Sequence, residues 1–138
     1  MDWEECYKKR IVKEVKEDKE LISSLKNSSE NKMKSSDELT MKETTSASKF
    51  SLAYDSLREL LEALAIKKGY KIYSHECFTA FLKEILDEKQ KGDRFDEIRR
   101  IRNEINYYGK DITTGESKEM INKVKNLRKE ILYLLNIN

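Results

Sequence analysis

Apolar side chains recur at helical spacing along most of this chain, and the pattern predicts helices. The first periodic segment begins after Asp2, a residue type that caps helix N-termini, and continues to Leu25. Its predicted apolar face consists of Trp3, Tyr7, Ile11, Val15, Ile22 and Leu25. The polar run 27–34 has little to bury and several residues that favour turns, so we expect a connecting loop there.

A second helix is predicted from Ser35 to Lys68. Ser35 and Glu38 have the spacing of a capping box, and Gly69 is the residue type that commonly follows a helix end. The second half of this segment has the stronger apolar stripe, which consists of Phe50, Tyr54, Leu57, Leu61, Leu64 and Ala65.

Two further helices follow the connector 69–73. The third is expected to begin after Ser74 and to end at Gly92. Its inward face is predicted to contain Cys77, Phe78, Phe81, Leu82, Ile85 and Leu86. The fourth is expected to begin after Asp93 and to end at Gly109.

A fifth helix should begin near Thr113, which stands three residues before Glu116 as in a capping box. Its predicted buried residues are Met120, Ile121, Val124, Leu127, Ile131, Leu132 and Leu135. Short connections between the later helices favour antiparallel neighbours. The pattern therefore predicts an all-α, up-and-down bundle of four to five helices that forms a single domain over residues 1–138.

Composition supports this fold class. The 138 residues include no proline and four glycines, whereas a β-sandwich or barrel needs many turns. Charged residues are 39% of the chain and hydrophobic residues 38%, a balance typical of helices with one buried and one solvated face.

The net charge and the cysteine content limit the classes of function that the chain can have. Lys plus Arg is 28 and Asp plus Glu is 26, so the net charge of +2 is too small to attract nucleic acid over the whole surface, and such binding must be local. The sequence shows no apolar leader and no membrane span, which predicts a soluble cytoplasmic protein. Cys6 and Cys77 form no CxxC pair and the chain has one histidine, His75. We therefore expect two free thiols, no metal and no cofactor.

The fourth predicted helix has a polar strip along the shoulder of its apolar face. Helical spacing places Arg102 beside the apolar stripe, in line with Arg99, Asn103 and Asn106. An arginine pressed against apolar neighbours loses hydration and needs a carboxylate, a carbonyl or an anionic ligand. Arg102 could extend to solvent or pair with an acidic residue of another helix; alternatively, it binds a phosphate. In the second case Asn103 and Asn106 could orient a sugar or base, and the flanking Tyr107 and Tyr108 could stack on a base or simply pack at the helix end.

These residues resemble a known family. The segment RNEINYYG, together with SLAYDSLRELLEAL and GYKIYSHECFTAFLKEIL, is similar to the HEPN superfamily from about Lys49 to Leu135. The resemblance implies a HEPN-like bundle that forms a homodimer, with the motif helices lining a cleft at the interface. It also implies RNA binding or metal-independent endoribonuclease activity, and a minimal nucleotidyltransferase as partner in a toxin–antitoxin pair.

The chain departs from the family motif at one position. Arg102 and Asn103 match its first two residues, but the positions at which the family has histidine are Tyr107, Tyr108 and Gly109. Imidazole, with a pKa of about 6.5, suits the abstraction of a proton from the RNA 2′-hydroxyl, whereas a phenol with a pKa of about 10 does not. Asn106 and Tyr107 are more similar to a related branch of the superfamily, which has an acidic or amide residue followed by tyrosine at this place.

Three hypotheses remain open. We favour a dimeric module that binds RNA or a nucleotide phosphate through Arg102 and Asn103, with Asn106, Tyr107 and Arg99 beside them. The second hypothesis is an active endoribonuclease in which Tyr107 or His75 replaces the motif histidine. The third is a protein-interaction bundle in which an internal salt bridge occupies Arg102.

Overall fold

The computed structural model describes residues 1–137, which form six α-helices, one π-helical turn and a two-stranded sheet. The elements are α1 (Trp3–Lys8), β1 (Val12–Glu14), α2 (Lys19–Glu38), α3 (Ser46–Lys67), β2 (Tyr70–Ile72), α4 (His75–Ala80), η1 (Phe81–Ile85), α5 (Lys89–Tyr108) and α6 (Thr114–Asn136). The chain is therefore mostly helical, which confirms the predicted helical bundle. The described residues contain more helices than predicted, and the small sheet was missed.

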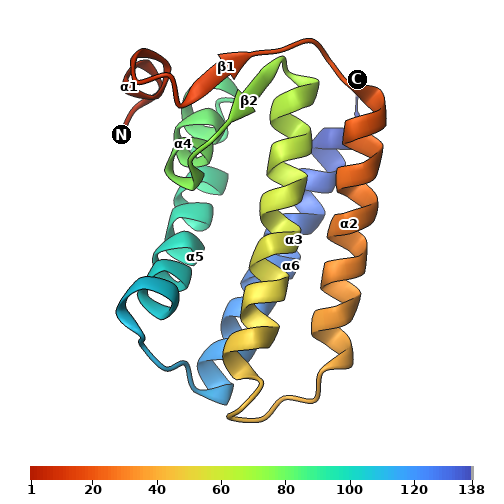
Figure 1. Cartoon of the computed structure of the whole chain (residues 1–138), viewed down its shortest axis with the longest axis vertical. Coiled ribbons are helices and arrows are strands. Elements are labelled where there is room, and N and C mark those ends of the chain that lie inside the picture. The colour runs from red at the N-terminus through yellow and green to blue at the C-terminus, as the bar shows by residue number, and fades with distance from the viewer. Residues whose placement is uncertain (138) are drawn as a thin grey trace.

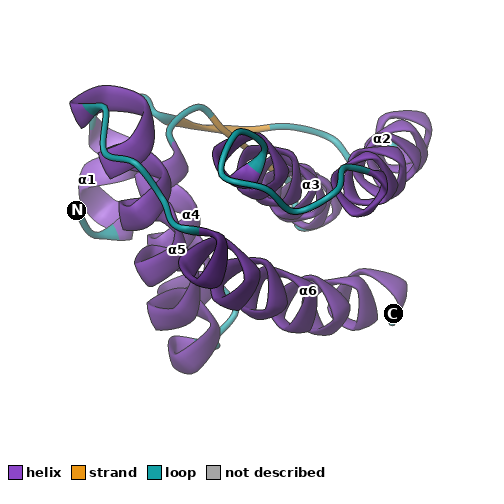
Figure 2. Cartoon of the chain, turned by 90° about the horizontal axis from the view of Figure 1, so that it is seen from below, coloured by secondary structure: helices purple, strands orange, loops and turns teal. Residues whose placement is uncertain are grey.

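Helix α3 lies at the centre of the molecule. Figure 1 shows α2 and α3 side by side, with α3 returning along α2, and Figure 2 shows α6 beneath this pair and α4 and α5 to one side. Residues on several faces of α3 are buried, among them Phe50, Tyr54, Leu57, Leu61 and Leu64. Because α3 has neighbours on these faces, its second half carries apolar side chains on several sides.

The predicted loop at 27–34 is wrong, because these residues belong to α2. Ser29, Met33 and Ser36 are buried and continue the helix face that begins with Ile22 and Leu25. The Ser29 hydroxyl donates to the Ser56 carbonyl at 2.6 Å, and the Ser36 hydroxyl donates to the Lys49 carbonyl at 2.8 Å. Small, hydrogen-bonded serines thus form the contact face against α3, although their polarity suggested a loop.

The predicted helix start at Ser35 is also wrong, since Ser35 lies near the end of α2 and α3 begins at Ser46. The buried Lys49 ammonium donates to the Ser36 carbonyl and, at 2.7 Å, to the Leu39 carbonyl. These bonds add donors to carbonyls at the end of α2, of which the Ser36 carbonyl also accepts from the Leu39 amide at 3.3 Å. At its other end, α3 finishes at the predicted position, with Lys68 as the C-cap before a glycine.

The first periodic segment consists of a helix, a strand and part of a second helix. Asp2 is the N-cap of α1, as predicted, and its carboxylate accepts from the Glu5 amide at 2.9 Å. Arg10 then adopts a left-handed conformation with φ of 59°, which ends the helical course. Val12 pairs with Ile72 in the antiparallel sheet β1–β2. This pairing brings the N-terminal segment to the beginning of α4.

Gly92 does not end the third helical unit, because α5 runs through it. A Cβ atom at Gly92 would lie 2.5 Å from Lys83 Cγ and 3.2 Å from the Thr79 carbonyl oxygen. Glycine here allows α5 to approach α4 and η1 closely, which a sequence pattern cannot distinguish from a helix terminator. Gly109 is the C-cap of α5, with φ of 64°, as its position predicted.

Helix α6 matches the prediction closely. Thr113 and Glu116 form both bonds of the capping box. The predicted inward residues are buried, with Leu132 partly so. In η1, by contrast, Ile85 was expected to face inward and is exposed. Among residues 1–137, no helix combines the length and apolar character needed to cross a bilayer.

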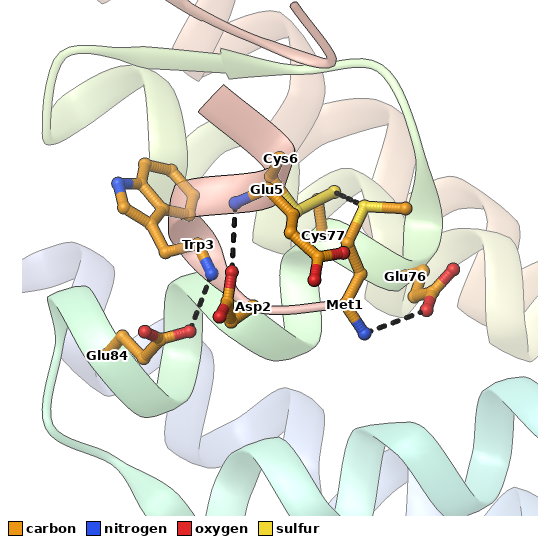
Figure 3. Close-up of a disulfide and its surroundings, with 8 residues drawn as sticks. All are labelled: Met1, Asp2, Trp3, Glu5, Cys6, Glu76, Cys77 and Glu84. Atoms are coloured by element: carbon orange, nitrogen blue, oxygen red, sulfur yellow. Dashed lines mark hydrogen bonds and ion pairs between the residues drawn. A yellow bond between two sulfur atoms is a disulfide. The ribbon is translucent and has the colours of Figure 1, made fainter. Parts of the chain in front are cut away.

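Cys6 and Cys77 form a disulfide, so the prediction of two free thiols is wrong. The bond joins α1 to α4, and both cysteines are fully buried (Figure 3). The Trp3 amide also donates to the Glu84 carboxylate at 2.7 Å. The cysteines are 71 residues apart in sequence, and the strand pairing that brings them together was not predicted.

Candidate functional site

A pocket of about 480 Å³ lies between the segment leading into α4 and the second half of α5. Its lining includes Tyr73, His75, Arg99, Arg102, Asn103 and Tyr107. Glu76 is its one acidic lining residue. The pocket therefore brings the predicted polar strip of α5 together with the histidine at the start of α4.

Arg102 is a half-buried cation between aromatic rings. Its guanidinium carbon lies 5.2 Å from the centre of the Tyr54 ring and 5.9 Å from that of the Tyr107 ring. With the Asn106 amide oriented so that its oxygen faces the guanidinium, that oxygen accepts from Arg102 Nε at 2.9 Å. Aromatic faces and an amide oxygen fix the position of the guanidinium without neutralising its charge.

No carboxylate within residues 1–137 forms an ion pair with Arg102. The Asp96 carboxylate is 2.8 Å from Arg99 and 2.9 Å from Arg100, and the Glu62 carboxylate is 3.1 Å from Arg58. The neighbouring acidic groups thus neutralise other arginines, and Arg102 keeps its positive charge facing the pocket.

His75 is held by a buried tyrosine. Its Nδ1 atom lies 2.8 Å from the hydroxyl oxygen of Tyr54, whose side chain is fully buried. Burial, reinforced by the positive charges of Arg102, Arg58 and Arg99, lowers the pKa of His75 to about 4. Burial likewise raises the pKa of Tyr54 above its usual value. At neutral pH the imidazole is therefore uncharged and the phenol is protonated.

The tautomer of His75 determines what it offers to the pocket. If the Tyr54 hydroxyl donates to Nδ1, the other ring nitrogen, Nε2, bears a hydrogen and can donate to a phosphate oxygen. If Nδ1–H donates to Tyr54, Nε2 has a free lone pair and can accept a proton. The same hydrogen bond is thus compatible with a binding role and with a basic role.

The structure gathers four of the five predicted site residues in the pocket lining: Arg99, Arg102, Asn103 and Tyr107. Asn106 is exposed outside the lining and orients Arg102. Arg99 is partly neutralised by Asp96.

Sequence analysis missed two residues of this site, Tyr54 and Tyr73. Tyr54 was assigned to the core, and its buried hydroxyl, which requires a partner, was the available signal. Tyr73 lies in the connector after β2 and carried no sequence signal. His75, in the first turn of α4, is half-buried.

The pKa of His75 gives a direct test of this geometry. His75 is the only histidine of the chain, so one imidazole signal reports it in a proton NMR titration. We expect a midpoint near pH 4. Arg102→Met removes the charge and retains an apolar side chain, so the midpoint should rise toward 6.5. A wild-type midpoint at 6.5 that the substitution leaves unchanged would contradict the described burial and charge around His75.

The lowered pKa of His75 also predicts how the stability of the protein depends on pH. Between about pH 4 and 6.5 the unfolded chain binds a proton at His75 that the folded chain does not, so the free energy of unfolding should fall as pH decreases through this window. Urea unfolding at several pH values should show this loss, and His75→Asn should remove that part of it.

Residues 1–137 contain no group of three or more His, Cys, Asp or Glu side chains placed to hold a metal ion. No protein-family model, curated protein or solved structure matches this chain. The resemblance to the HEPN superfamily therefore stays a prediction.

Proposed function

We propose that this protein binds RNA or a nucleotide through a phosphate group in the Arg102 pocket. The observation that supports the proposal is the guanidinium of Arg102, which lines an open pocket and has no carboxylate partner among the described residues. A half-buried cation that lacks a carboxylate partner is stabilised most by an anionic ligand. A guanidinium can donate two parallel hydrogen bonds to phosphate oxygens.

The surrounding side chains suit the same ligand. Asn103 adds amide donors and an acceptor for a sugar or base, and Arg99 adds positive charge from the preceding turn of α5. Asn106 holds the guanidinium, so that little side-chain entropy is lost when a phosphate binds. The small net charge of the chain agrees with a local site rather than a basic surface.

The test compares Arg102→Ala with Arg94→Ala, a matched loss of one arginine from the same helix. Arg94 pairs with Glu130 at 2.6 Å and lies outside the pocket. We expect Arg102→Ala to weaken the binding of labelled RNA about 10- to 100-fold, as for the loss of charged hydrogen bonds. The slope of the logarithm of affinity against the logarithm of salt concentration should also decrease, by the amount that corresponds to about one phosphate contact. Equal affinities of wild type and Arg102→Ala, with circular dichroism showing both folded, would refute the proposal.

A second candidate function is metal-independent RNA cleavage, and the observation that favours it is the presence of His75 in the same pocket as Arg102. In this reaction Nε2 of the neutral imidazole takes the proton of a 2′-hydroxyl, and the 2′-oxygen attacks the phosphorus. The bond to the 5′-oxygen breaks, that oxygen takes a proton from water, the resulting hydroxide takes the proton held on Nε2, and a 2′,3′-cyclic phosphate forms. Arg102 would stabilise the charge on the phosphate oxygens.

The third hypothesis, a bundle used only for protein association, required an internal salt bridge at Arg102. The described residues provide none, and this favours the ligand-binding proposal.

We retain three expectations that rest on the resemblance alone: a HEPN-like origin, a homodimer with the pocket at its cleft, and a minimal nucleotidyltransferase partner. Light scattering of the purified protein tests the dimer, and co-purification from the native host tests the partner.

A further inference from the structure

We propose that the pocket selects nucleic acid with unpaired bases, and that Tyr73 and Tyr107 are the residues that stack on those bases. The inference rests on the proposed function and specifies the class of ligand. Its basis is the exposure of both tyrosine rings, which line the pocket that contains Arg102.

Both rings are largely open to solvent: Tyr73 is 59% exposed and Tyr107 is 69% exposed. They reach the pocket from different elements, Tyr73 from the connector between β2 and α4, and Tyr107 from the last turn of α5. Neither ring contributes to the buried core, so core packing does not account for their positions. Two exposed aromatic rings at one polar pocket are typical of a ligand-binding surface.

Each tyrosine is accompanied by a basic side chain. The Lys71 ammonium lies 5.6 Å from the centre of the Tyr73 ring, and the Arg102 guanidinium lies 5.9 Å from that of the Tyr107 ring. A nucleotide has the complementary pair of groups, a flat base and an anionic phosphate joined by a sugar. Lys71 is not itself a lining residue of the pocket, but Tyr73 and Tyr107 both are, so these two pairs of aromatic ring and cation match at least two successive nucleotides of a strand.

This arrangement distinguishes between possible ligands. A free phosphate would use the cations and leave both rings without a role. In a duplex the base faces are covered by neighbouring base pairs, so a tyrosine could not stack on them without unpairing the strands. A single strand offers both its phosphates and its base faces, and it is the ligand that uses all four side chains.

The experiment measures the affinity of a short labelled oligoadenylate by fluorescence anisotropy. The protein variants are wild type, Tyr73→Ala, Tyr107→Ala and Tyr133→Ala. Tyr133 is the matched control because it is 66% exposed, lies on α6 and is outside the pocket. We expect each pocket substitution to weaken binding about 5- to 100-fold, as for the loss of one base–aromatic stack, and Tyr133→Ala to have no effect. Tyr107→Trp should retain the affinity.

Further binding measurements distinguish between the possible ligands. Inorganic phosphate should bind more weakly than the single strand, and so should the duplex formed by annealing the strand to its complement. A DNA strand of the same sequence tests whether the protein also recognises the 2′-hydroxyl of RNA. If Arg102→Ala loses affinity while both tyrosine variants bind like wild type, or if the duplex binds as tightly as the single strand, this inference is overturned and the proposed function survives. If wild type binds no oligonucleotide, or Arg102→Ala binds unchanged, the proposed function fails as well.

Discussion

Loss of the disulfide between Cys6 and Cys77 is expected to lower the free energy of unfolding by about 4 kcal/mol, the chain-entropy value for a closed loop of this length. The bond attaches α1, a helix of six residues, to α4, and an isolated helix of that length is not stable in water. A domain of this size commonly has a stability of about 5–15 kcal/mol, so the loss is a large fraction of the total.

The measurement is urea unfolding of the oxidised protein, of the protein reduced in denaturant and kept reduced, and of the double variant Cys6→Ala with Cys77→Ala. Reduced wild type and the double variant should show similar stabilities, both well below that of the oxidised protein. Reductant should leave the double variant unchanged, which serves as the control. Equal stability of oxidised and reduced wild type would show that the bond does not constrain the unfolded chain as assumed.

Sequence patterns predicted the helices with conventional ends and a single apolar face. Helix α6 has a capping box and a regular stripe, and both were found as expected. The errors occurred where a residue has a role that its local pattern does not reveal. Ser29 and Ser36 are contact residues between helices, and Gly92 allows a close approach. The segment from Val12 to Glu14 becomes a strand because Tyr70–Ile72, far along the chain, pairs with it.

The candidate site was predicted in part for a similar reason. All five proposed residues lie on α5, whose helical periodicity fixes which of them share a face, and four of them line the pocket. Their relation to His75 depends on how α4 packs against α5, and their relation to Tyr54 depends on α3. Local periodicity contains no information on such contacts between helices. The motif arginine was therefore predictable, whereas the imidazole beside it required the structure.

The largest expected effect concerns the second candidate function. If the protein cleaves RNA, His75→Asn should reduce the rate about 10²- to 10⁴-fold, the usual contribution of a general base. Asparagine can keep a hydrogen bond to Tyr54 but cannot take up a proton at neutral pH, so the variant separates the chemical role of His75 from its structural role. RNA affinity should change much less than the rate.

The assay uses mixed RNA with a chelator present, and mass spectrometry of the products should identify 2′,3′-cyclic phosphate ends. Because the pKa of His75 is lowered to about 4, the imidazole loses its proton near that pH, and the second-order rate constant kcat/KM of the free enzyme should rise through pH 4 and then level off. Tyr54→Phe removes only the hydroxyl that positions the ring, so it should lower the rate less than His75→Asn does. Cleavage that persists in His75→Asn would exclude His75 as the base, and RNA binding without cleavage in wild type would leave the pocket as a binding site.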